Sequence, residues 1–275
     1  MDKMMGHSER EYGKVARIGV ALPPANTTVE PEMKILMPPG VSFFATRMIS
    51  QGSTARQRLI DYAENIDSWV GSFYGAELDA VFFACTGSCY LIGHDREIEM
   101  LNLMSRKWGM PMFSAASSIT HALQSMQVKK IALISPYPEW LTEVAASYWK
   151  AGGFDVVAVE HVVEGGVPDP TMRGIYAMRA DQVDEAFGRL NEHPKWQSVE
   201  AVLITGVGMA SMAAIGQLSA KTPVPVISSM LCLAWAGLKG LGIDNATLGA
   251  DGGLITGAPM AKWLSRAMSQ PFLTG

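Results

Sequence analysis

Positive charge is scarce in this chain, and it is not concentrated anywhere. Lys and Arg together number 22 against 26 Asp and Glu, which gives a formal net charge of −4, and the basic side chains are scattered along the sequence. A surface that binds nucleic acid needs a basic patch or stripe. The composition therefore argues against nucleic acid as a partner.

A long uninterrupted apolar run is also missing. Hydrophobic residues make up 48% of the chain, yet no apolar run reaches the roughly 18 residues that a membrane-spanning helix needs. Residues 1–7, MDKMMGH, carry polar and charged groups where a secretory signal would have its apolar core. We therefore expect no membrane partner and a cytoplasmic protein.

Cysteine and histidine are too sparse for a disulfide framework or a metal centre. The three cysteines are Cys85, Cys89 and Cys232, and the five histidines show no paired spacing of the kind that zinc sites use. Each cysteine is then either a buried apolar filler or a reactive thiol. We predict no metal.

A dinucleotide fingerprint is present only in part. Gly206 and Gly208 follow a predicted strand, but Ser211 stands where the third glycine of the motif belongs, and no acidic residue follows at the usual distance. The pattern therefore does not support a nucleotide cofactor.

What the sequence does contain is a regular alternation of strands and helices. Short apolar runs bounded by proline, glycine or polar residues indicate buried strands, and apolar residues at intervals of three and four indicate helices. The predicted strands are 17–22, 41–46, 81–85, 110–114, 129–135, 154–159, 200–205 and 224–228; the predicted helices are 55–74, 94–108, 115–123, 139–151, 181–190 and 229–241.

The second half of the chain repeats the order of the first. Residues 129–137 resemble 17–24, each an apolar run that ends at proline, and residues 200–208 follow the design of 81–88. This order indicates an internal duplication. We predict an α/β fold with two pseudo-symmetric lobes, each an open, mostly parallel sheet flanked by helices, and an active site in the cleft between them.

The lobes are assigned from the same repeat. We expect the first lobe to comprise residues 17–122 together with 236–275 and to carry Cys85. The second lobe is expected at residues 123–235, with Gly206, and residues 1–16 form an N-terminal arm.

The run at residues 81–88, VFFACTGS, stops abruptly at a thiol, a hydroxyl, a glycine and a second hydroxyl. Ligands of open α/β sheets bind at the carboxyl ends of the strands. A strand that ends at Cys85 would therefore deliver this thiol to the floor of a pocket for a small anion.

Hydroxyl groups and small residues also follow the other predicted strands. Backbone amides at helix starts carry partial positive charge, so such a site can hold a carboxylate and stabilise an enolate that forms beside it. Ser and Thr at these places can equally be helix caps, and this alternative stays open for each of them. The segments concerned are 26–28, 85–88, 117–118, 136–137, 206–208 and 228–229.

Four of these segments carry a family resemblance. They are similar to the signature segments of the aspartate/glutamate racemase superfamily, in particular its maleate cis–trans isomerase and arylmalonate decarboxylase branch. The similar segments are 23–30 (PPANTTVE), 84–88 (ACTGS), 135–137 (SPY) and 225–229 (PVISS). The resemblance implies a two-lobed fold without metal or organic cofactor, with one cysteine offered from each lobe to opposite faces of the substrate.

One departure from the family pattern decides which chemistry we expect. Cys85 matches the first cysteine position, but Gly206 stands at the second. Racemisation by this route needs an acid on one face and a base on the other, so a chain with one cysteine is a poor racemase. The resemblance then favours decarboxylation of a malonate-type, arylmalonate-like acid, because only one acid is needed to protonate the product.

The residues assigned to the site follow from the same resemblance. Cys85 is the predicted catalytic residue, and Tyr137 is expected to donate its phenol to the substrate carboxylate or enediolate. The remaining predicted substrate-binding residues are Asn26, Thr86, Gly87, Ser88, Gly206, Val207 and Gly208. The expected partner is a small carboxylate substrate, and the sequence leaves open whether the chain forms a homo-oligomer.

Two alternatives remain open. In a maleate-type cis–trans isomerase, Cys85 as a thiolate would add to an alkene carbon, allow rotation about the resulting single bond and then leave, which requires a lowered thiol pKa. In a non-catalytic relative, the hydroxyl-rich pocket would bind a ligand without turnover.

Overall fold

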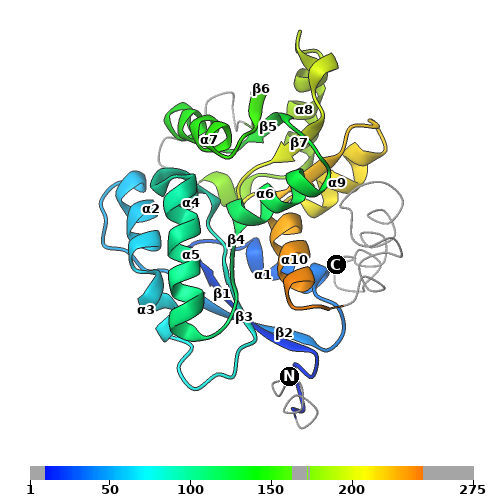
Figure 1. Cartoon of the computed structure of the whole chain (residues 1–275). Helices are drawn as coiled ribbons and strands as arrows, with labels where there is room; N and C mark the ends of the chain where they lie inside the picture. Colours follow the sequence, from blue (N-terminus) through cyan, green and yellow to red (C-terminus); the bar gives the residue numbers. More distant parts are fainter. Residues whose placement is uncertain (1–9, 163–171, 173, 244–275) are drawn as a thin grey trace.

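The computed structural model describes residues 10–162, 172 and 174–243 of the chain (Figure 1). Two sheets of four parallel strands each form its centre, and Figure 1 shows the second sheet above the first. Short buried runs such as Ala80–Phe83 form strands because they are apolar on both faces and each face is covered by helices. The predicted fold class is confirmed.

The first sheet has the strand order β2-β1-β3-β4. Its strands are β1 (Ala16–Leu22), β2 (Val41–Arg47), β3 (Ala80–Phe83) and β4 (Met112–Ser114). The helices of this half are α1 (Val29–Leu36), α2 (Ala55–Glu64), α3 (Ile66–Gly71), α4 (Thr86–Ile92), α5 (His94–Trp108) and α6 (Ala115–Ser125).

The second sheet repeats this topology as β6-β5-β7-β8, which confirms the duplication inferred from the sequence. Its strands are β5 (Lys130–Ser135), β6 (Asp155–His161), β7 (Ala201–Ile204) and β8 (Val226–Ser228). The helices are α7 (Glu139–Ala151), α8 (Ala180–Asn191), α9 (Met212–Ser219) and α10 (Ser229–Gly240), with short 3₁₀ turns η3 (Gly174–Ala177) and η4 (Trp196–Ser198).

One predicted helix is wrong in its extent. The expected helix over residues 55–74 is divided into α2 and α3 at Asn65, whose backbone has φ −99° and ψ 21°. The Asn65 side-chain amide donates to the carbonyl of Asp61 at 2.8 Å. Such a local bond competes with the backbone ladder, which is why asparagine interrupts the amphipathic pattern here.

Helix α10 joins the two halves. It follows β8 of the second sheet but packs against α6, α1 and the first sheet, and Figure 1 shows it beside α6. The expected lobe boundary between residues 235 and 236 lies inside this helix. At Gly237 the backbone approaches Phe82 of β3 so closely that an added Cβ would lie 2.0 Å from the ring atom Cζ.

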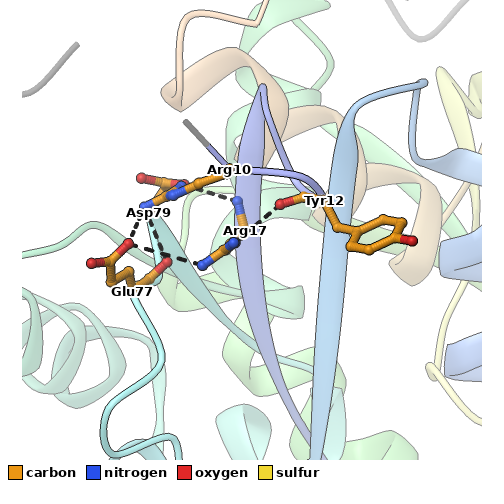
Figure 2. Close-up of polar contacts among 5 residues, drawn as sticks. All are labelled: Arg10, Tyr12, Arg17, Glu77 and Asp79. Atoms are coloured by element: carbon orange, nitrogen blue, oxygen red, sulfur yellow. Dashed lines mark hydrogen bonds and ion pairs between the residues drawn. The ribbon is translucent and has the colours of Figure 1, made fainter. Parts of the chain in front are cut away.

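A polar network holds the chain ahead of β1 against the turn ahead of β3 (Figure 2). Asp79 Oδ2 accepts from Arg10 Nη1 and from the backbone amide of Arg17, both at 2.8 Å. Arg10 also donates to the carbonyl of Glu77 at 3.3 Å. Residues 10–16 of the expected N-terminal arm are therefore tied to the first sheet, and residues 1–9 lie outside the described part.

Within the described residues, no helix has the length and apolar character needed to span a bilayer.

The contact between α10 and β3 gives a test of the packing. We expect Gly237→Ala to lower the free energy of unfolding by about 1–3 kcal/mol, because Phe82 is fully buried and its ring cannot move aside without disturbing the core. Gly188→Ala in α8 is the matched control: no atom lies within 4 Å of its added Cβ, so a gain of about 0.5–1 kcal/mol is expected. Urea denaturation measures both, and an unchanged midpoint for Gly237→Ala would contradict this packing.

Candidate active site

The site begins at Cys85, which lies between the end of β3 and the first residue of α4. Since β3 is a central strand, its carboxyl end is covered by neighbours, and the Cys85 side chain is only 4% exposed. Thr86, Gly87 and Ser88 form the first turn of α4, and all three are buried. The structure thus places the predicted thiol at the expected edge of the sheet.

The thiol is held in its protonated form. Burial raises the pKa of Cys85, and hydrogen bonds from Ser88 oppose this shift without cancelling it. One of these bonds runs from Ser88 Oγ to Cys85 Sγ at 3.1 Å. At neutral pH the resting site therefore contains an acid beside a hydroxyl group, and a thiolate forms only if a ligand or base removes the proton.

Tyr137 lies against Gly206, the residue that the sequence analysis assigns to the second cysteine position. Gly206 has a φ of 93°, a conformation that favours glycine. A Cβ added to Gly206 would lie 3.1 Å from Tyr137 Oη and 3.0 Å from Pro136 Cγ. Burial is the largest cause that raises the pKa of Tyr137 well above its usual range, and the charges of Tyr90 and Cys85 add to the shift. The phenol is thus a neutral donor close to both Gly206 and the thiol.

Helix α4 also contacts the strand that leads to Gly206. Tyr90 of α4 and Thr205 share a hydrogen bond of 2.6 Å between their hydroxyl oxygens. The Tyr90 ring packs edge-on against the Tyr137 ring, with 6.2 Å between the centroids. These contacts bring the thiol-bearing segment of the first lobe and the glycine segment of the second lobe together, as the sequence predicts.

The predicted segment at Asn26, just ahead of α1, contacts the same part of the second lobe. Asn26 Oδ1 accepts from the amides of Thr28 and Val29 at 2.9 and 3.0 Å, and its Nδ2 donates to the carbonyl of Val207 at 3.3 Å. Thr28 Oγ1 donates to the carbonyl of Gly208 at 2.7 Å. Asn26 therefore acts as a helix cap and a contact between lobes, and its role in substrate binding stays a prediction.

The side chains of the first turn of α4 differ in what they contact. Thr86 is fully buried, and its side chain lies by the Tyr137 phenol, where it opposes the rise in the pKa of Tyr137. Gly87 lies where α2 and α7 converge, and an added Cβ would come within 3.3 Å of Leu59 and 3.4 Å of Leu141. A close approach of helices explains the glycine at position 87 without a substrate contact.

The sequence does not reveal two tyrosines near the thiol, Tyr62 of α2 and Tyr176. Burial and the charge of Cys85 raise the pKa of Tyr62 to about 12 and that of Tyr176 beyond it, while Arg58 opposes both shifts. The Tyr176 ring also packs on Gly208, where an added Cβ would lie 2.6 Å from Cε1. The amphipathic pattern identifies α2 as a helix, but nothing in it marks Tyr62 as lying near Cys85.

Two glutamates are buried at the boundary between the lobes, and the sequence predicts neither. Glu32 of α1 contacts the start of α9, and Glu97 of α5 accepts hydrogen bonds from Ser114 and from Tyr148 of α7. Burial raises the pKa of both carboxyl groups. Each glutamate thus links an element of the first half to one of the second through neutral donors.

A separate surface cavity of about 350 Å³ lies between α2, α3 and α5, with Ile66, Arg96 and Met100 in its wall. It includes none of the predicted site residues. Within the described part of the chain, no three His, Cys, Asp or Glu side chains converge as a metal ion would require.

The comparison with known proteins agrees with this arrangement. The model of the arylmalonate decarboxylase family matches residues 18–254. The maleate isomerase of Geobacillus stearothermophilus is 27% identical over 260 residues, which is 88% of this chain and 97% of the relative. The maleate isomerase of Pseudomonas putida is 25% identical over 258 residues, which is 88% of this chain and 98% of the relative. These relatives are similar over nearly their whole length.

Solved structures show the same fold. A cysteine mutant of the maleate cis–trans isomerase of Nocardia farcinica, with a covalently bound succinylcysteine intermediate, superposes with a TM-score of 0.71 at 24% identity, covering 84% of this chain and 94% of its own. Arylmalonate decarboxylase superposes with a TM-score of 0.65 at 17% identity, covering 82% and 92%. The prediction of an enzyme from the branch that contains decarboxylases and cis–trans isomerases is confirmed, and the chain belongs to the arylmalonate decarboxylase family.

Proposed function

We propose that this protein decarboxylates a malonate-type acid without a cofactor, and that Cys85 protonates the product carbon from one face. The observation that supports this is the asymmetry of the site. A buried thiol of raised pKa lies on the first lobe, and Gly206 with the Tyr137 phenol lies at the matching place on the second. A site with one neutral thiol suits a reaction that needs one acid.

The reaction balances with the groups present. The bond between the central carbon and one carboxylate breaks, carbon dioxide leaves, and the electron pair passes into an enediolate on the remaining carboxylate. Neutral donors near the thiol, the Tyr137 phenol and the Thr86 hydroxyl, stabilise this charge. The Cys85 S–H then donates its proton to carbon, and solvent restores the proton to the thiolate.

The isomerase alternative has its own supporting observation. The curated relatives are maleate isomerases, and a cysteine mutant of the Nocardia farcinica isomerase holds a covalently bound succinylcysteine intermediate. In this chain the same chemistry would need the Cys85 thiolate, which burial disfavours. A bound dianionic substrate would increase that cost unless Arg58 offsets its charge.

Turnover of a disubstituted malonate in heavy water tests the proposal. Phenylmalonate and its α-methyl homologue should each release carbon dioxide. Each product should carry one deuterium on its α-carbon, delivered to one face only. Cys85→Ser should lower kcat by about 10²- to 10⁴-fold, the usual contribution of a positioned general acid. Cys232→Ala is the control, because this thiol is fully buried in α10 and should be dispensable.

The other outcomes point to the alternatives. A substrate-sized mass adduct on Cys85 after incubation with maleate, without release of carbon dioxide from any malonate, would favour the isomerase. Binding of both acids without turnover would favour a non-catalytic relative.

The pH dependence of kcat separates the two chemistries. A decarboxylase needs the thiol, whose pKa is raised by burial, so its kcat should stay level through neutral pH and fall only above the ordinary thiol value of about 8.5. An isomerase needs the thiolate, and its kcat should instead rise with pH over the same range. Steady-state rates at saturating substrate between pH 6 and about 10 measure this, and a rising profile would contradict the decarboxylase.

A further inference from the structure

Residues 26–32 of the first lobe and 207–212 of the second are joined by hydrogen bonds that Asn26, Thr28 and Glu32 make, and Glu32 is the ionisable side chain of the three. Glu32 lies on α1 and is 4% exposed. It accepts from the backbone amides of Ser211 and Met212, the latter at 3.0 Å, and from Ser211 Oγ at 3.0 Å. Its partners are all neutral donors at the start of α9. No positive charge in these contacts compensates the burial of the carboxylate.

The segment that Glu32 holds begins at Gly206 and Gly208, which pack against the Tyr137 and Tyr176 phenols. The charge of Cys85 raises the pKa of both phenols, so the segment lies on the Cys85 side of the second lobe. The Gly206 amide donates to Ser229 Oγ at 2.9 Å, which fixes one end of the segment within its own lobe. Thr28 holds Gly208 from the first lobe at 2.7 Å. Glu32 holds the far end, and Ser211 Oγ accepts from the Ser228 hydroxyl, with 2.9 Å between the two oxygens. If the Glu32 contact opens, the segment is released on the side of the first lobe.

We propose that Glu32 is a positioning residue, a proton-dependent latch that keeps the 206–211 segment of the second lobe closed over Cys85. This deepens the proposed function, since the segment forms one wall of that site. The contact itself is independent of which reaction the site performs.

The direction of the proton dependence follows from burial. Desolvation raises the pKa of Glu32 from 4.5 to about 7, against the opposing effect of the bonds from Ser211 and Met212. When the lobes part, the carboxyl group regains water and its pKa returns toward the ordinary value. A proton therefore binds more tightly to the closed form, so that closure is strongest at low pH and weakens as the pH rises through about 7.

The charged groups nearby are accounted for by other partners. On α1 itself, Glu30 is ion-paired with Arg47, and Lys34 lies in the last turn. On α10, which packs against α1, Lys239 lies over the Trp235 ring at 4.9 Å and burial raises the pKa of the Cys232 thiol. Helix α9, MAAIGQLS, has no ionisable side chain. Burial of Glu32 is therefore the main cause of the dependence.

The accessibility of Cys85 to a thiol reagent measures opening without any substrate. Alkylation of Cys85 by iodoacetamide is followed by mass spectrometry on the native protein. The wild-type rate is divided by the rate of the Glu32→Gln variant at the same pH. Because thiol ionisation affects both rates equally, its pH dependence cancels in this ratio. Glutamine can accept the two amides with Oε1 and donate to Ser211 Oγ, so this variant should stay closed at every pH.

The wild-type ratio should rise on the order of ten- to a hundredfold between pH 5 and pH 8, with a midpoint near the pKa of about 7. Glu32→Ala lacks the contact and should react fast at both ends of this range. Cys232, fully buried in α10, is the internal control for global unfolding.

A ratio that stays flat with pH would overturn the latch, and so would a Glu32→Ala protein that reacts no faster than Glu32→Gln. Parallel labelling of Cys232 would likewise overturn it, because opening would then be unfolding. None of these readouts uses turnover, so an absence of decarboxylation leaves this result standing and bears only on the proposed function.

Discussion

Removal of the Cys85 thiol from water is the constraint on which the rest of this site depends. A thiol in bulk water is partly ionised near neutral pH, whereas burial between two lobes keeps it neutral. The neighbouring phenols of Tyr62, Tyr137 and Tyr176 are kept neutral for the same reason. The resting site is thus a set of uncharged donors, ready for a negative charge that only the substrate supplies.

The lobes are joined by the same kind of contact. Tyr90 meets Thr205, Tyr148 meets Glu97, and Ser211 meets Glu32, each across the boundary between the two halves. Hydrogen bonds to a buried carboxylate are individually strong, but desolvation of the charge offsets much of their gain. Such contacts therefore fix the relative position of the two halves while adding little net stability.

The sequence predicts the framework well because the framework depends on local patterns. Buried strands such as 81–83 are recognisable from continuous apolar residues, and their alternation with helices implies parallel sheets. The break at Asn65 is missed because the apolar spacing continues across it. Helix α9 is missed because MAAIGQLS combines small residues with little amphipathic contrast.

The environment of the site is less predictable for a different reason. Cys85 and Gly206 could be identified by their positions after equivalent strands of the two halves. The partners of Glu32 lie about 180 residues away in the chain, and no local pattern indicates that a glutamate on an amphipathic helix faces inward. Arg58 and Tyr62 are likewise placed by the packing of α2 against α4.

The left-handed backbone of Gly206 limits how this protein could acquire a second thiol. A side chain at this position meets both an unfavourable φ and the Tyr137 phenol. A cysteine at position 206 would strain the backbone, and Pro136 or Tyr137 would have to shift by a few tenths of an ångström to admit its Cβ. Any residue with a side chain at position 206 should therefore cost folding stability as well as change the shape of the pocket.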